Sequence, residues 1–297
     1  MSRELKELGA MRRVHLVLCA MLLLLVATPL VVSAKDGESK FATLDGAKIH
    51  YQSYGQGSDA FVLVHGWSSN LTAWSNQIPD LAKRGRVIAL DLPGHGQSDK
   101  PQIAYTMDHF AAAIDAVMRD AKVERAVLLG HSMGTPVVRQ FYRKYPRKTL
   151  AIVIVDGGLR PFGDKATRDQ FMNTFRSPNY KEAAAPMFAQ MAGMASAEDQ
   201  ERIKASFLNT PQNVLVSAME SMNEESLYAP DKINVPVLAI LAKSPFWPAD
   251  TEQFLKSLAP DLEFHLLEGV DHFLHLEKAK DFNNTVIAFV DKKKLLK

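Results

Sequence analysis

The sequence of 297 residues is poor in the groups from which disulfides, metal centres and cofactor sites are built. It holds a single cysteine, Cys19, which excludes an internal disulfide, a cysteine-based zinc site and a dithiol redox pair. It also contains no GxGxxG fingerprint, no Walker loop and no HExxH motif. We therefore expect neither a cofactor nor a metal.

An excess of charge of one sign is also lacking. The sequence has 35 Lys and Arg residues against 33 Asp and Glu residues, a formal net charge of +2. This balance gives no electrostatic reason to expect nucleic acid or an acidic surface as a partner. The hydrophobic fraction of 47% is too high for a disordered chain and large enough for a sizeable core. These features predict a globular protein whose partner is a small-molecule substrate.

The first 34 residues have the features of a secretory signal peptide. Arg12 and Arg13 precede a long apolar run, and the small residues of Val32-Ser33-Ala34 are suited to a cleavage site. We predict export to the periplasm or the exterior, whether translation begins at Met1 or at Met11. An uncleaved membrane anchor over residues 14–32 is the alternative. Residues 1–34 contain four basic and two acidic residues, so the remaining 263 residues carry 31 of each sign.

Eight short segments of the remaining chain have the character of β-strands. Six are near-continuous apolar runs, typical of parallel strands buried on both faces, and two more polar segments around Asp45-Gly46 indicate an antiparallel hairpin. In chain order the segments are residues 41–44, 48–54, 60–64, 87–90, 126–129, 152–155, 237–241 and 262–267. Amphipathic stretches separate them, which predicts an α/β fold: a mostly parallel eight-stranded sheet with helices on both sides.

The alternation of strands and helices is interrupted between residues 159 and 229. This stretch is helical by pattern and carries half of the 12 methionines. We interpret it as an inserted helical cap, which either packs as ordinary helices or forms a lid whose thioethers line an apolar pocket. The predicted core then has two parts, residues 35–158 and residues 230–297.

The motif Gly130-His131-Ser132-Met133-Gly134 stands between a predicted strand and a predicted helix. A serine on such a sharp turn takes strained dihedral angles and needs small residues two positions away on each side. The turn also places Ser132 at a helix N-terminus, where backbone N–H groups and the helix dipole favour negative charge. Ser132 is therefore the candidate nucleophile.

A serine nucleophile needs a base, and three histidines follow Ser132 in the sequence. His272 follows the last predicted strand across a short loop and is expected at the same edge of the sheet as Ser132. His265 lies inside that strand, and His275 lies in the next helix. We predict His272 as the base. A metal site formed by the three histidines with Asp271 has no typical ligand spacing, so no metal is predicted.

The negative oxygen formed during acyl transfer needs two preorganised N–H donors near the nucleophile. Met133 directly follows Ser132, and its backbone N–H is the first candidate. The second is the backbone N–H of Trp67, in the loop that follows the predicted strand 60–64. We predict structural or pocket-lining roles for the side chains of His65 and Trp67.

With these motifs the sequence resembles the α/β-hydrolase fold family, in particular its single-domain esterase, haloperoxidase and C–C hydrolase branch. The matching segments are His65-Gly66-Trp67, Asp91–Asp99, Gly130–Gly134 and Asp271–Glu277, in the family's order. The resemblance implies a nucleophile elbow, a Ser–His–acid triad and a cap inserted after the sixth strand. It also implies that residues 91–99 form a structural turn. Ser132 separates the chain from the dehalogenases and epoxide hydrolases of this fold, which carry Asp at that position.

The triad acid is where the sequence departs from the family. The family usually takes this residue from the loop after the seventh strand, where this sequence has Pro245 near the expected position and Asp250 as the nearest acid. Asp156 lies at the end of the sixth predicted strand, and some family members take their acid from that position instead. We favour Asp156 because a carboxylate at a strand end is held more rigidly than one in a long loop. Asp250 is the second candidate.

These residues predict an exported serine hydrolase that cleaves a carboxylic ester or similar acyl bond of a small, apolar substrate through an acyl-enzyme. The same triad also serves C–C bond hydrolysis, aminopeptidase action, perhydrolysis and acyl transfer. A non-enzymatic receptor for a small hydrophobic ligand is the alternative from a different class. Turnover of esters distinguishes an enzyme from a receptor.

Overall fold

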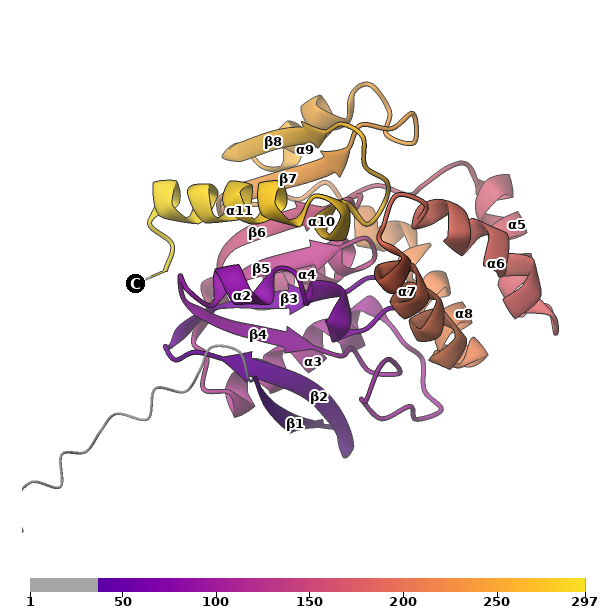
Figure 1. Cartoon of the computed structure of the whole chain (residues 1–297), viewed down its shortest axis with the longest axis horizontal. Coiled ribbons are helices and arrows are strands. Elements are labelled where there is room, and N and C mark those ends of the chain that lie inside the picture. The colour runs from indigo at the N-terminus through magenta and orange to yellow at the C-terminus, as the bar shows by residue number, and fades with distance from the viewer. Residues whose placement is uncertain (1–36, 297) are drawn as a thin grey trace, which may run out of the picture. The chain divides into compact units, whose positions relative to one another are not determined.

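The computed structural model describes residues 37–296, and the predicted signal segment lies outside the described residues. An eight-stranded sheet has the strand order β1-β2-β4-β3-β5-β6-β7-β8 (Figure 1). The strands are β1 (Glu38–Leu44), β2 (Ala47–Tyr54), β3 (Asp59–Val64), β4 (Arg86–Leu90), β5 (Arg125–His131), β6 (Thr149–Val155), β7 (Val237–Ala242) and β8 (Leu262–Leu267). Strand β2 is antiparallel to both of its neighbours, and all other pairs are parallel. The predicted mostly parallel eight-stranded sheet is confirmed.

Helices cover both faces of the sheet because its central strands are apolar on both sides. One core cluster joins the sheet to α3 (Met107–Asp120), α4 (Gly134–Lys144) and α9 (Thr251–Leu258). The other joins it to η1 (Leu71–Trp74), α2 (Ile78–Leu81), α10 (Leu274–Glu277) and α11 (Ala279–Lys293). A short 3-10 helix, η2 (Pro146–Lys148), precedes β6. Over residues 37–296, none of these helices has both the length and the apolar character to cross a membrane.

The range in which the cap was predicted contains helices and no strand of the described sheet. These helices are α5 (Lys165–Arg176), α6 (Tyr180–Met191), α7 (Ala197–Asn209), α8 (Gln212–Met222) and η3 (Glu225–Tyr228). Figure 1 shows α5–α8 together, beyond the carboxyl ends of the parallel strands. They share a core that also includes Phe273 and Leu276, and in it the rings of Phe188 and Phe207 stack with centroids 4.1 Å apart. Of the methionines there, Met172 and Met219 are buried and Met194 is exposed.

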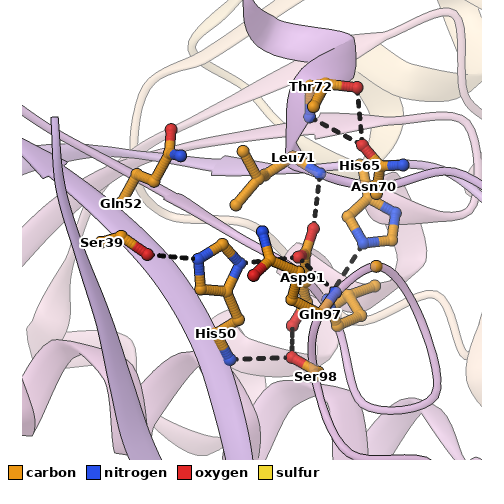
Figure 2. Close-up of polar contacts among 12 residues, drawn as sticks. Ser39, His50, Gln52, His65, Asn70, Leu71, Thr72, Asp91, Gln97 and Ser98 are labelled. Carbon is orange, nitrogen blue, oxygen red and sulfur yellow. Dashed lines mark hydrogen bonds and ion pairs between the residues drawn. The ribbon is translucent and has the colours of Figure 1, made fainter. Parts of the chain in front are cut away.

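Residues 91–99 form a turn organised by the buried carboxylate of Asp91 (Figure 2). This carboxylate accepts hydrogen bonds from the backbone N–H groups of Leu71 (2.7 Å) and Gln97 (2.9 Å), and lies 2.8 Å from Nδ1 of His50. Burial alone would raise the pKa of Asp91, but these contacts, above all the one with His50, hold it below its ordinary value. The turn therefore ties β2 to the loops that follow β3 and β4.

Candidate active site

Ser132 lies in the turn between β5 and α4 and has the left-handed backbone conformation, with φ of 52°. Such a φ is uncommon outside glycine and marks a strained turn. A Cβ atom on Gly130 would lie 2.4 Å from the carbonyl oxygen of Gly134, and one on Gly134 would lie 2.5 Å from that of Val64. Both glycines are thus required sterically. The turn leaves the Ser132 side chain half-buried at the sheet edge.

Asp156 directly follows β6 and is the acid that the structure brings to His272. Its Oδ2 atom lies 2.7 Å from Nδ1 of His272. Its Oδ1 atom accepts hydrogen bonds from the backbone N–H of Ala242 (2.8 Å) and from the indole N–H of Trp247 (3.1 Å). The backbone of Asp156 also has a positive φ, 40°, and its side chain is only 5% exposed. Three segments of the chain therefore fix one carboxylate.

Asp250, the second candidate acid, has a different partner. Its carboxylate forms an exposed ion pair with Arg160, at 2.7 Å, and the hydrogen bond from Arg160 lowers the pKa of Asp250. The residue stands just before α9 as its N-terminal cap position. The geometry therefore joins His272 to Asp156 and assigns Asp250 to the surface.

The His272 ring is oriented for proton transfer. Because Nδ1 faces a carboxylate, it carries the proton in the neutral ring, which leaves Nε2 free to accept one. Among the described residues, Nδ1 of His272 is bonded to Asp156, and no hydrogen bond joins Nε2 to Oγ of Ser132. The ring is 20% exposed, so solvent and substrate can reach it.

His131, inside the serine motif, holds the backbone of His272. Its Nε2–H donates to the His272 carbonyl oxygen at 2.9 Å, and the two rings lie 4.7 Å apart. Burial lowers the pKa of His131 far below its ordinary value, and the nearby His275 and His272 lower it further, so the ring is neutral. His275 is fully buried, whereas His265 is exposed on β8. The described part of the chain contains no cluster of three or more His, Cys, Asp or Glu side chains suited to a metal ion.

The backbone N–H groups of Trp67 and Met133 are available as oxyanion donors. Within residues 37–296, neither donates a hydrogen bond to another residue. A Cβ atom placed on Gly66 would lie 3.0 Å from Cβ of Ser132, so the peptide that leads into Trp67 runs directly past the serine. Met133 follows Ser132 at the start of α4. Both predicted donors thus lie beside the predicted nucleophile.

Residues of the cap region contact this site at Trp67 and at Asp271. The indole N–H of Trp67 donates to the carbonyl oxygen of Leu215 in α8 at 2.9 Å, and the Trp67 ring meets that of Phe175 edge-on with centroids 4.6 Å apart. The backbone N–H of Met194, after α6, donates to the carboxylate of Asp271 at 3.2 Å. The contacts of Trp67 hold the loop that contains it, and the contact of Asp271 holds the residue before His272.

The sequence prediction missed the contacts of His131 and Trp247. His131 lies inside the motif that carries Ser132, but its pattern says nothing about which carbonyl the ring meets. Trp247 lies 91 positions from Asp156 along the chain. No local signal marks a contact over that separation, because it depends on how the loop after β7 folds back.

The chain belongs to the α/β-hydrolase fold family, because the family model described as "alpha/beta hydrolase fold" matches residues 59–279.

Individual relatives and solved structures are similar to the chain at low sequence identity or over only part of its length. It is 26% identical to a 2-hydroxy-6-oxononadienedioate/2-hydroxy-6-oxononatrienedioate hydrolase of Burkholderia vietnamiensis, over 89% of this chain and 99% of that one. It is 35% identical to an uncharacterised protein of Mycobacterium tuberculosis, but over only 40% of this chain and 35% of that protein. The chain therefore aligns with about a third of the length of that relative. The solved structure of Est816, described as an N-acyl homoserine lactone degrading enzyme, matches with a TM-score of 0.70 and 26% identity, over 84% of this chain and 100% of that one.

Proposed function

We propose that the protein is a serine hydrolase that cleaves a carboxylic ester of a small, apolar substrate. Ser132 is the nucleophile, His272 the base and Asp156 the acid of its triad. The observation that carries the proposal is the 2.7 Å contact between Asp156 and His272, at the sheet edge where the strained turn presents Ser132. An imidazole paired with a buried carboxylate is the arrangement that activates a serine hydroxyl.

The reaction follows from the positions of these groups. Oγ of Ser132 attacks the ester carbonyl carbon while Nε2 of His272 takes the hydroxyl proton. The N–H groups of Trp67 and Met133 hold the negative oxygen of the tetrahedral intermediate. Its collapse breaks the C–O bond, and His272 gives its proton to the leaving alcohol. A water molecule that gives a proton to His272 then attacks the acyl-enzyme carbonyl carbon, the bond to Oγ of Ser132 breaks, and His272 returns the proton to Ser132 as the carboxylic acid leaves.

The surroundings of the site support an apolar substrate. The Trp67 ring, beside the oxyanion loop, packs against Phe171, Phe175 and Phe188 of the cap-region helices. The likeness to Est816, described as an N-acyl homoserine lactone degrading enzyme, is consistent with cleavage of an ester bond. C–C bond hydrolysis is the second candidate, because the 2-hydroxy-6-oxononadienedioate hydrolase matches this chain over 99% of its own length.

We propose that the protein acts outside the cytoplasm with a small-molecule substrate as its partner. The support is the pattern of residues 1–34, with Arg12 and Arg13 before an apolar run and small residues up to Ala34. To test cleavage, the protein is expressed in a Gram-negative host, and its mass is compared with the mass of the full-length chain. A full-length, membrane-associated product would favour the anchor over residues 14–32.

Labelling with a fluorophosphonate probe, together with hydrolysis of p-nitrophenyl esters from acetate to octanoate, tests the catalytic proposal. We expect the wild type to be labelled and to turn over at least one ester, and Ser132→Ala to lose both properties. Ser226→Ala, at an exposed position in η3, is the matched control and should retain both. Folded wild-type protein that neither reacts with the probe nor hydrolyses any ester would refute the proposal and favour a ligand receptor.

A further inference from the structure

The loop between β7 and α9, residues 243–250, brings an indole N–H to the carboxylate of Asp156. We propose that Trp247 is a positioning residue of the catalytic triad: its N–H holds Oδ1 of Asp156, so that Oδ2 stays directed at His272. This inference rests on the proposed function of Ser132, His272 and Asp156. The loop after β7 would then contribute to the triad through Trp247, and not through its own acid, Asp250.

The hydrogen bonds of Asp156 show why a second donor on Oδ1 matters. A carboxylate with two equivalent oxygens can turn about its last torsion, which is broad and has no strong staggered preference. On Oδ1, Asp156 meets the backbone N–H of Ala242 at 2.8 Å and the indole N–H of Trp247 at 3.1 Å, and on Oδ2 it meets Nδ1 of His272 at 2.7 Å. Two donors from different directions fix the carboxylate plane more firmly than the backbone N–H alone.

The loop is folded so that the Trp247 ring turns inward. Pro245, Phe246 and Pro248 are exposed, whereas Trp247 between them is half-buried. Its backbone N–H donates to the carbonyl oxygen of Ser244 at 3.2 Å, which closes a turn.

The loop also lies against the residues that follow β6. A Cβ atom on Gly158, two residues after Asp156, would lie 3.6 Å from the Trp247 ring. At the end of the loop, Asp250 is anchored by its ion pair with Arg160. The indole therefore approaches Asp156 from a loop that is fixed at its turn and at its far end.

A purely structural role for Trp247 predicts different measurements. If the ring only covers the strand ends, its loss lowers stability and reduces the active fraction, without changing how the rate depends on pH. If the N–H positions Asp156, its loss acts on proton transfer through His272. The turnover number then falls more than KM changes, and the pH profile moves.

Trp247→Phe keeps an aromatic ring and removes the N–H. We expect kcat for p-nitrophenyl butyrate to fall about tenfold with KM changed less than about twofold, in keeping with loss of a hydrogen bond to a charged group. Trp74→Phe is the matched control, because the buried Trp74 Nε1 atom has no hydrogen-bond partner among residues 37–296. It should lose stability without this fall in kcat. If Trp247→Phe does not fold, replacement of Trp247 by β-(3-benzothienyl)alanine keeps the bicyclic shape and still removes the N–H.

If Trp247 had only a packing role, its substitution would not change how kcat/KM depends on pH. A carboxylate that has lost a donor stabilises an imidazolium more strongly, so the acid limb of kcat/KM should move upward by about half a pH unit or more. The other titratable groups around His272 are His131, Asp271, His275 and Glu277, and none of them forms a hydrogen bond with Trp247. A shift of the limb therefore reports on Asp156.

The outcomes separate this inference from the proposed function. If fluorophosphonate labels Ser132 in the wild type but Trp247→Phe matches Trp74→Phe in kcat and in pH profile, the positioning role is wrong and the triad stands. If Ser132 does not react in the wild type, the proposed function fails first. A fall in kcat together with an upward shift of the acid limb supports the positioning role.

Discussion

Asp156→Asn is the substitution that tests the triad most directly. The asparagine side chain has nearly the same shape as the aspartate, but one oxygen becomes an NH₂ group. Ala242 and Trp247 both donate to Oδ1, so the amide oxygen must take that position to keep both hydrogen bonds. The NH₂ group then faces Nδ1 of His272, which lies 2.7 Å from the other oxygen in the wild type.

This arrangement reverses the tautomer of the base. An NH₂ group can only donate, so Nδ1 of His272 must accept and the ring proton moves to Nε2. Nε2 can then no longer accept the proton of Ser132, and the stabilisation of the imidazolium by a negative charge is lost as well. In the serine protease triad the equivalent change lowers kcat by about 10⁴-fold, which corresponds to about 5 kcal/mol of transition-state stabilisation. We expect a loss of that order here.

The measurement is kcat/KM for p-nitrophenyl butyrate at pH 7, with thermal unfolding to show that the variant is folded. Asp250→Asn is the matched comparison: it removes an exposed carboxylate whose ion pair with Arg160 holds the end of the loop, so kcat/KM should fall far less than in Asp156→Asn. Loss of activity in Asp250→Asn with retention in Asp156→Asn would move the acid to the loop and refute the argument from the structure.

Two further predictions concern the scaffold of the site. Gly134→Ala should lower the free energy of unfolding by at least about 1–3 kcal/mol in urea titrations and reduce ester hydrolysis, because the new Cβ would meet the backbone oxygen of Val64 at 2.5 Å; an unchanged midpoint would contradict the steric argument. Asp91→Asn should destabilise the protein at pH 7 by about 1–3 kcal/mol. Because the folded state lowers the pKa of Asp91 below its ordinary 3.8, its stabilisation is complete above that value and is lost as the pH falls through the folded pKa. The difference in the free energy of unfolding between Asp91→Asn and the wild type should therefore shrink below about pH 4. A difference that does not change with pH would argue against an ionic contribution of Asp91.

The sheet was predictable because its strands are buried on both faces. The segment 126–129 was recognisable from its apolar residues alone, yet β5 runs from Arg125 to His131. The additional residues at the strand ends are set by pairing: His131 is paired with Val155 of β6, although histidine is not a residue that an apolar pattern includes. Continuous burial thus predicts where a strand lies, whereas its ends depend on neighbours that are distant in the sequence.

Some residues of the site were likewise predictable from the local sequence, whereas others depend on contacts between distant parts of the chain. The turn around Ser132 has a signature because its steric demands fall on residues two positions away, and His272 has one because it follows a strand across a short loop. Asp156 and Asp250 were both reasonable acids, since each comes after a strand at the same sheet edge. Which of them meets His272 depends on the folding of loops. That information lies in contacts such as the one from Trp247.

The position of the acid also determines the role of the neighbouring strand. Strand β6 lies between β5 and β7 in the sheet, so an acid at the end of β6 lies next to the strand that carries Ser132 and next to the last residue of β7. Strand β7 can therefore hold the carboxylate from the side, through the N–H of Ala242 and through Trp247 in the following loop. In the triad that we propose, β6 supplies the carboxylate and the residues at and after the end of β7 orient it, so that the loop after β7 contributes Trp247 rather than an acid near Pro245.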